Sequence, residues 1–300
     1  MANQLATQHS GSTHTLCTTY DAYDPAFLEK VIPYVQYIEV TPDTIARALD
    51  DRFTLNASII NSLKDVLPFV KVIAHGVGLS IGSYDGYSKA YISLLDELFE
   101  TIPLAWHSEH LGYVRVNGEN LNTMLALPRT TEMLELVCDR VNFIQDRYNI
   151  PFLLENIVHL LPDAPGDFSD AQFLNELTSR TGCGLILDAY NLECDAHNHN
   201  FDIPAFLDEL DFSPVKEIHI AGGTEYKGFK LDIHTNLVSD STIDLTLRLL
   251  DMPSCQVETI NYELLPEAVN LLGHKAICEE LKRLSQIFNT ATNELTGISR

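Results

Sequence analysis

The sequence is poor in positive charge. It has 19 Lys and Arg residues against 42 Asp and Glu residues, which gives a formal net charge of −23. A surface of this sign repels phosphate backbones, which argues against nucleic acid as the main partner. The same charge is compatible with metal cations and with a basic or neutral peptide, although a need for solubility explains it equally well.

Long hydrophobic runs and closely spaced cysteines are also missing. No stretch reaches the roughly 18 apolar residues of a membrane span, and the polar segment 1–14 lacks the basic and apolar regions of a signal peptide. The six cysteines form no CxxC pair, which favours reduced thiols over a disulfide framework. These absences predict a cytoplasmic protein with no membrane partner.

Seven short apolar runs each end in a residue that can bind a metal. An apolar run of four to eight residues is typical of a buried strand, where a terminal charged or imidazole side chain is costly unless something pairs with it. A metal cluster at which the strand ends converge is the simplest explanation. The runs end at His75, His110, Glu155, Asp188, His219, the pair Asp232 and His234, and Glu258.

Strand-like and helix-like segments alternate along the chain, with no internal repeat and no linker. Helical patterns separate the strands, among them 44–68, 88–102 and 130–149. The eight expected strands are 15–20, 35–42, 70–78, 104–112, 152–157, 184–191, 215–223 and 255–260.

Eight strand–helix units predict an α/β fold, a (β/α)8 TIM barrel forming a single domain. We expect this domain over residues 15–290, between flexible tails at 1–14 and 291–300. Active sites of such barrels lie at the carboxyl ends of the strands, which is where the ligand-type residues fall. A doubly wound open sheet is the alternative, but it would gather residues from only two or three strands.

The set of candidate ligands is too large for one ion. A single site usually takes three or four protein ligands, and a catalytic site keeps one position open. The set therefore indicates two or three ions bridged by carboxylates. Imidazole and carboxylate ligands suit iron, manganese or zinc. Asp232 and His234 lie two apart on an extended segment, so their side chains point to the same side and can chelate adjacent ions.

Other polar residues near these runs have simpler interpretations. Glu109 faces the opposite way from His110 in a strand, so we expect it behind the ligands or in barrel packing. His159, His197 and His199 are predicted in loops and exposed to solvent, although the last two could line a substrate channel.

Seven motifs occur in an order that is typical of one family. They are HGVGLSIGS (75–83), HSEHLGY (107–113), LLENI (153–157), TGCGLILDAYNL (181–192), HNHNFDIPAFLDEL (197–210), EIHIAGG (217–223) and LDIHTN (231–236). Together they closely resemble the multinuclear non-heme iron-dependent oxidative enzymes. The resemblance implies a barrel of the endonuclease IV and xylose isomerase type holding two or three irons. It implies as ligands the strand-end residues named above, together with Asn191.

Members of that family oxidise cysteine residues of ribosomally made, post-translationally modified peptides (RiPPs) with dioxygen, commonly beside a partner protein that captures the peptide leader. The resemblance therefore implies an iron-dependent oxidase or oxygenase, and we expect Glu155, Asp232 and His234 to act at the reacting centre. Manganese or zinc is the alternative metal.

The chain departs from the family pattern at both ends of the motif series. Glu39 and Asp43 are the only acids near the second strand. At the last strand, we expect Glu258 to be the ligand and Glu263 the reserve.

Three other functions use the same residues. A divalent-metal-dependent sugar isomerase or epimerase of the xylose isomerase-like superfamily would share the barrel and the ligands, but it needs a lysine or a second glutamate pair at the strand ends. An apurinic-site endonuclease shares the three-metal site, although the net charge of −23 argues against it. A metal-storing or scaffolding subunit would leave the buried charges without a catalytic use.

Overall fold

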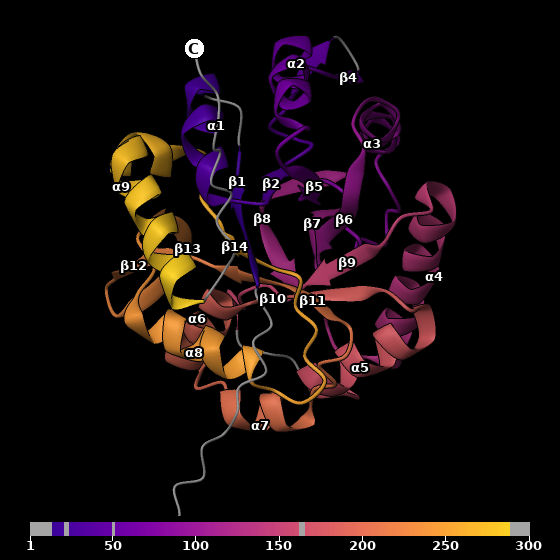
Figure 1. Ribbon diagram of the computed structural model, residues 1–300. Helices are drawn as coiled ribbons and strands as arrows, with labels where there is room; N and C mark the ends of the chain where they lie inside the picture. Colours follow the sequence, from indigo (N-terminus) through magenta and orange to yellow (C-terminus); the bar gives the residue numbers. More distant parts are fainter. Residues whose placement is uncertain (1–13, 21–23, 50–51, 162–165, 289–300) are drawn as a thin grey trace, which may run out of the picture.

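The computed structural model describes residues 14–20, 24–49, 52–161 and 166–288. Its centre is a closed barrel of eight parallel strands with helices around it (Figure 1). In barrel order the strands are β1 (Thr15–Thr19), β14 (Thr259–Tyr262), β11 (Val215–Ile220), β10 (Gly184–Asp188), β9 (Phe152–Glu155), β6 (Leu104–His110), β5 (Lys71–Gly76) and β2 (Tyr37–Val40), which pairs with β1. The predicted (β/α)8 barrel is confirmed. The predicted tails, His14 aside, lie outside the described residues.

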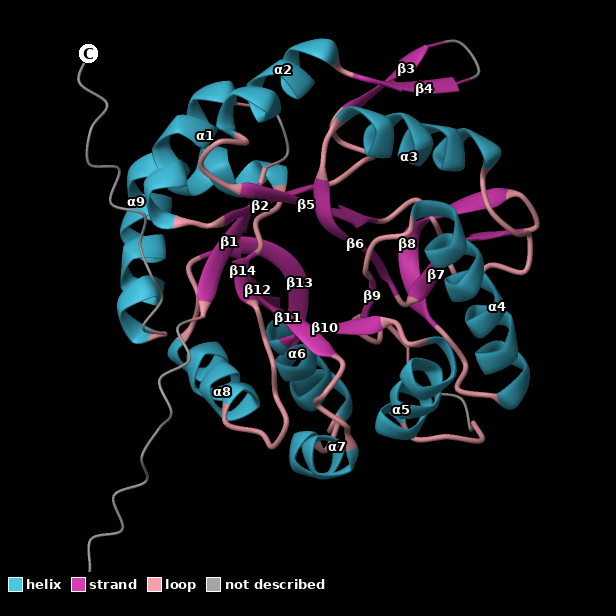
Figure 2. Ribbon diagram, turned by 45° about the vertical axis from the view of Figure 1, so that its right-hand side comes forward, coloured by secondary structure: helices cyan, strands magenta, loops and turns pink. Residues whose placement is uncertain are grey.

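The helices form a ring outside the strands (Figure 2). Their caps follow from the sequence: Ser169 and Gln172 make a capping box at the start of α5, and Gly182 ends that helix in the left-handed conformation. No described helix is long and apolar enough to cross a membrane. The helices are α1 (Pro25–Val31), the 3-10 helix η1 (Ile32–Tyr34), α2 (Ala57–Val66), α3 (Lys89–Thr101), α4 (Thr131–Tyr148), α5 (Asp170–Thr181), α6 (Ala189–His199), α7 (Ile203–Glu209), α8 (Asp240–Leu250) and α9 (Pro266–Ile287).

Alternation along the strands separates an inner from an outer layer of side chains. Trp106 on β6 belongs to a small buried cluster with one residue from each of five other barrel strands. The outward-facing apolar side chains of the barrel strands pack instead against the helices. The other members of this inner cluster are Cys17, Tyr37, Ile73, Leu153 and Ile186. This apolar layer fills the barrel below its carboxyl end.

Three antiparallel hairpins stand outside the barrel. They are β3 (Ala46–Leu49) with β4 (Arg52–Leu55), β7 (Gly112–Val116) with β8 (Glu119–Ala126), and β12 (Gly222–Tyr226) with β13 (Phe229–Asn236). Positive φ angles at the turn pairs Asn117–Gly118 and Lys227–Gly228 are those of a type I′ turn, which matches the twist of the strands. The second and third hairpins extend connections on the carboxyl side of the barrel.

Several predicted boundaries are wrong. The predicted helix 44–68 begins as the β3–β4 hairpin, because its first part pairs strand to strand before Asn56 caps α2. The predicted strand 184–191 ends at Asp188, whose carboxylate caps α6, so His197 and His199 end a helix and are not in a loop. The extended segment expected around Asp232 and His234 is part of β13, which is paired outside the barrel.

Candidate metal centre

Imidazoles and carboxylates converge at the carboxyl end of the barrel. His75 on β5, His110 on β6 and Glu155 on β9 form a first group. His75 Nε2 lies 2.9 Å from Glu155 Oε2, and His110 Nε2 lies 3.4 Å from the same oxygen. The strand register places His110 directly beside Glu155, so neighbouring strand ends deliver both side chains.

A second group shares Glu155 with the first. It combines Glu155, Asp188, His219 and Glu263, each of which offers one ligand atom within 4.8 Å of the others. His219 Nδ1 lies 3.1 Å from Glu155 Oε1 and 3.1 Å from Glu263 Oε2. Because one oxygen of Glu155 faces each group, this carboxylate is placed to bridge two ions.

A third group consists of Glu39, His75 and His219. Glu39 is fully buried on β2, and its Oε2 lies 3.4 Å from His219 Nε2. Its Oε1 accepts hydrogen bonds from Thr19 and Asn261. From the sequence, Glu39 is a nearby acid and not a predicted ligand. The sequence feature that points to it is a single carboxylate inside the otherwise apolar strand YIEV.

The β12–β13 hairpin brings two further candidates to this end of the barrel. The residues between Leu231 and Asn236 bulge opposite Gly223, and Asp232 and His234 lie in this bulge. His234 Nδ1 lies 3.0 Å from Glu263 Oε2, whereas its Nε2 contacts an Asp232 oxygen and lies 3.8 Å from Asp188 Oδ2. The two side chains thus adjoin the second group.

The buried polar atoms of this end of the barrel fit a metal. Each atom would be costly to bury without a partner, and a cation would satisfy them together. No cysteine belongs to the three groups, and imidazole with carboxylate suits iron, manganese or zinc. The atoms without a hydrogen bond include Glu39 Oε2, Glu155 Oε2, Asp188 Oδ2, Asn191 Oδ1, Asp232 Oδ1 and His234 Nε2.

Hydrogen bonds of Nδ1 fix which ring nitrogen of His75 and His110 faces Glu155. His110 Nδ1 donates to the carbonyl of Gly76 at 2.9 Å, and His75 Nδ1 lies 2.9 Å from the Ser108 hydroxyl. Both rings therefore turn Nε2 toward Glu155. Partners of this kind orient metal-binding imidazoles and select their tautomer.

Neighbouring carboxylates raise the pKa values of three histidines at this end of the barrel. Burial opposes the charge of His75, but Glu155 and Glu39 raise its pKa to about 9. Burial likewise opposes charge on His219 and His234, yet neighbouring carboxylates hold their pKa values well above the ordinary one. The imidazoles lower the pKa of Glu155 in spite of its burial. A bound metal would displace protons from these imidazoles.

Glu258 lies at the other end of the barrel, which corrects its predicted position. β14 begins only at Thr259, so Glu258 precedes the strand and does not end it. Its carboxylate bonds the Tyr37 hydroxyl and lies 2.5 Å from Lys216 Nζ and 3.7 Å from Lys71 Nζ. Lys71 begins β5, so this cluster marks the amino-terminal face. Glu263, the predicted reserve, is the acid that reaches the centre.

Asn191 and Glu109 lie where the sequence suggests. Asn191 is buried one turn into α6, with its amide nitrogen 3.2 Å from the carbonyl of Asn156, and its role as a ligand remains a prediction. Glu109 faces α3 and not the centre. It accepts hydrogen bonds from the Tyr91 hydroxyl at 2.8 Å and pairs with His107 Nε2 at 3.1 Å, as barrel packing requires.

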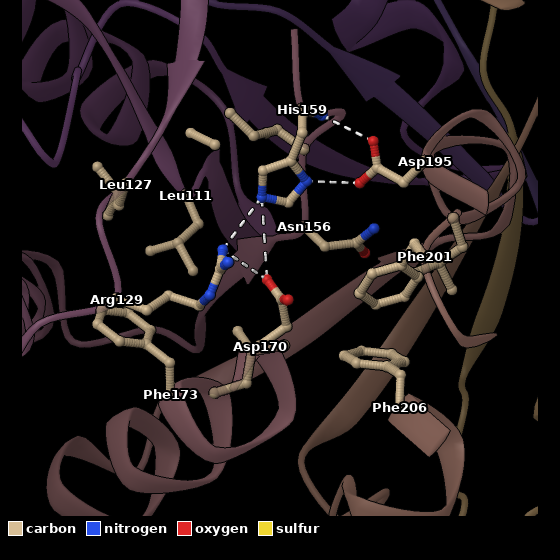
Figure 3. Close-up of a pocket in the computed structure, with 14 residues that line it drawn as sticks. Leu111, Leu127, Arg129, Asn156, His159, Asp170, Phe173, Asp195, Phe201 and Phe206 are labelled. Carbon is tan, nitrogen blue, oxygen red and sulfur yellow. Dashed lines mark hydrogen bonds and ion pairs between the residues drawn. The ribbon is translucent and has the colours of Figure 1, made fainter. Parts of the chain in front are cut away.

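His159 is mostly buried, contrary to the prediction of a solvent-exposed loop residue. Its Nδ1 lies 2.6 Å from Asp195 Oδ2, and its Nε2 lies 3.2 Å from Arg129, which pairs with Asp170 at 2.9 Å (Figure 3). This network lines one side of a pocket whose other walls are largely apolar. The pocket adjoins the candidate metal centre through Asn156, which lines the pocket, follows Glu155 and hydrogen-bonds the backbone of Asp188.

The fold and the site together define a (β/α)8 barrel with a candidate multinuclear metal centre at its carboxyl end. The chain belongs to the family described as RiPP precursor modification enzyme MbnB/TglH/ChrH, whose model matches residues 21–287. It is 32% identical over 220 residues to a UPF0276 protein of Caulobacter vibrioides, covering 72% of this chain and 75% of that protein. It is 31% identical over 245 residues to a UPF0276 protein of Vibrio vulnificus, covering 80% and 84%.

Several solved structures share the fold. The IOLI protein with a bound zinc atom matches with a TM-score of 0.59 at 15% identity, covering 92% of this chain and 98% of that one. A D-psicose 3-epimerase matches at 0.55 and 10% identity, covering 91% and 99%. Endonuclease IV from Thermus thermophilus matches at 0.51 and 16%, covering 90% and 100%. These likenesses establish the barrel type.

Proposed function

We propose that the chain is a multinuclear iron enzyme that uses dioxygen to oxidise a cysteine-containing peptide. The observation that carries the proposal is a shared ligand: Glu155 belongs to two of the three groups and turns one carboxylate oxygen toward each of them. Shared ligands favour adjacent ions over separate sites. The family description, which names modification of RiPP precursors, supports a peptide substrate.

The proposed ligands divide by group. His75, His110 and Glu155 would hold one ion, and Glu155, Asp188, His219 and Glu263 would hold its neighbour. Glu39 extends the centre below them, and Asp232, His234 and Asn191 complete its rim. Bound iron would supply an open position for the substrate thiol, which loses its proton on coordination, and a route for electrons to dioxygen.

Substrate access is expected on the side of the most exposed candidates. The Asp232 and His110 side chains are 28% and 20% exposed, whereas His75, Glu155, Asp188 and His219 are at most 2% exposed. Asp232 at this rim therefore lies nearest to the entering substrate. The buried residues instead fix geometry and exclude water.

The net charge of −23 favours a neutral or basic peptide, since an acidic one would be repelled. A partner protein that captures the peptide leader belongs to the same proposal. Such a partner would bring a neutral substrate to the centre without long-range charge attraction.

The test is metal analysis joined to turnover. Protein purified without oxygen is loaded with iron, the bound iron is counted, and a cysteine-containing peptide is followed by mass spectrometry with and without dioxygen. We expect at least two irons per chain and an oxygen-dependent mass change that His234→Ala abolishes. Fewer than two irons, or full activity of His234→Ala, contradicts the proposal. If manganese- or zinc-loaded protein epimerises D-fructose and no peptide reacts, the sugar epimerase alternative replaces it.

A further inference from the structure

A carboxylate with no role in the groups above lies directly beside His219. Glu217 on β11 is fully buried, two residues before His219. Its Oε2 accepts a hydrogen bond from Trp106 Nε1 at 2.9 Å, and its Oε1 makes no hydrogen bond but lies 3.4 Å from His219 Nε2. Burying a carboxylate costs free energy unless the group is paired, so the position of Glu217 indicates a function.

His219 faces acidic groups with both of its ring nitrogens. Its Nδ1 lies 3.1 Å from Glu155 and Glu263, and its Nε2 lies 3.4 Å from Glu39 and Glu217. The amide nitrogen of Asn261 also lies 3.4 Å from Nε2, but it donates its shorter hydrogen bond, of 2.8 Å, to Glu39 Oε1. A neutral imidazole carries a proton on one nitrogen and binds a metal through the other. The group that holds the proton therefore decides which set of carboxylates shares an ion with His219.

We propose that Glu217 is a positioning residue that accepts the Nε2 proton of His219 and thereby commits Nδ1 to the ion held by Glu155, Asp188 and Glu263. Glu39 is less suited to this task, because its Oε1 is already occupied by Thr19 and Asn261 and its Oε2 belongs to the group with His75. The Trp106 indole completes the arrangement by holding Oε2 and so turning Oε1 toward the imidazole. The inference rests on the proposed metal centre but not on its substrate or its reaction.

The substitution Glu217→Gln reverses the polarity of this contact at nearly constant shape. The indole N–H of Trp106 requires an acceptor, so the amide oxygen turns to Trp106 and the amide NH2 faces His219 Nε2. A donor at that point favours the tautomer with its proton on Nδ1, where the metal should bind. We therefore expect weaker metal binding in a protein that remains folded.

A double variant tests whether Trp106 orients the side chain at position 217. In Trp106→Phe/Glu217→Gln the indole donor is gone, so the amide is free to turn its oxygen toward His219. We expect metal affinity to recover in this double variant relative to Glu217→Gln. Glu109→Gln is the matched control, because Glu109 is an equally buried carboxylate that faces α3 and not the centre.

The measurement uses zinc, which is diamagnetic, with metal-free full-length protein. Chelator competition gives the zinc affinity, and nitrogen-15 NMR of the histidine rings gives the protonated nitrogen of His219. We expect Glu217→Gln to bind zinc 10- to 100-fold more weakly, Glu109→Gln to bind it normally, and the wild-type spectrum to show an Nε2 proton in the zinc form. Wild-type affinity in Glu217→Gln, no recovery in the double variant, or an Nε2 without a proton would overturn the proposal. Since no turnover is measured, an incorrect substrate assignment leaves this test unaffected.

Discussion

At the scale of single residues, the direction of one side chain decides between structure and metal binding. His107 and Glu109 point outward from β6 and bond each other, whereas His110 on the same strand points to the centre. Period-two alternation made this distinction predictable from sequence. The position of a strand's end is harder to predict, and one such error exchanged Glu258 for Glu263.

The pair Glu263→Gln and Glu258→Gln tests this correction. Glu263 contacts His219 and His234 at 3.1 and 3.0 Å, so we expect its amide variant to lose at least tenfold in metal affinity. Glu258 is 37% exposed and pairs with lysines at the other face, so its variant should bind metal normally and lose at most about 1 kcal/mol of stability. Chelator competition and thermal unfolding measure the two effects. A metal defect in Glu258→Gln alone would contradict the assignment.

Glu39→Gln tests whether Glu39, a candidate ligand that the structure adds to those predicted from sequence, binds metal. The amide oxygen can keep the hydrogen bonds from Thr19 and Asn261, while the NH2 group takes the place of the oxygen that faces His219. We therefore expect a folded protein that binds one metal equivalent fewer than wild type. Metal counting after reconstitution decides this, with circular dichroism as the check on folding. An unchanged metal count would remove Glu39 from the centre.

At the scale of elements, the β12–β13 hairpin supplies candidate ligands beyond those on the barrel strands. β13 packs against α6 and α9, and its bulge carries Asp232 and His234. The two ends of this hairpin approach each other closely at Gly222. A Cβ atom added to Gly222 would lie 2.0 Å from the carbonyl oxygen of Leu237. Backbone atoms cannot move aside as a flexible side chain can.

Gly222→Ala should accordingly force the two strands apart at the base of the hairpin and shift the bulge that carries Asp232 and His234. We expect weaker metal binding through loss of the Asp232 and His234 contacts, together with a destabilisation on the order of 1–3 kcal/mol from overpacking. Gly228→Asn is the control, because Gly228 has open space around it and asparagine tolerates its positive φ of 80°. Metal affinity and unfolding midpoints of both variants provide the comparison. Equal behaviour of the two variants would show that the hairpin does not position the site.

At the scale of the whole molecule, the barrel was predictable because eight buried runs and their helices each carry a local signal. Most candidate ligands at the centre were predictable for the same reason, since a strand such as GLILD ends on its one polar residue. Glu39 lies inside its strand, and the β14 boundary depends on pairing with β1 and β11, which no local pattern encodes. The network around His159 likewise joins segments that only the folded chain brings together.

The charges gathered at one end of the barrel make metal-free protein respond to pH in a definite direction. The folded-state pKa of His75 is raised to about 9 from an ordinary value near 6.5. A raised pKa contributes stability that is fully present below about pH 6.5 and is lost as the pH rises through about 9. His219 and His234, whose pKa values are also raised, act in the same sense.

We therefore expect the unfolding temperature of chelator-treated protein to fall by several degrees between pH 6.5 and 9. The depressed pKa values of Glu155 and Glu263 oppose this only at acid pH, where stability is lost as the pH drops below their ordinary values. Metal-loaded protein should behave oppositely in the neutral range, because metal replaces protons on the imidazoles and binds more tightly as the pH rises. Thermal unfolding across pH, with and without zinc, separates the two. Parallel profiles would mean that the clustered imidazoles do not bind the metal.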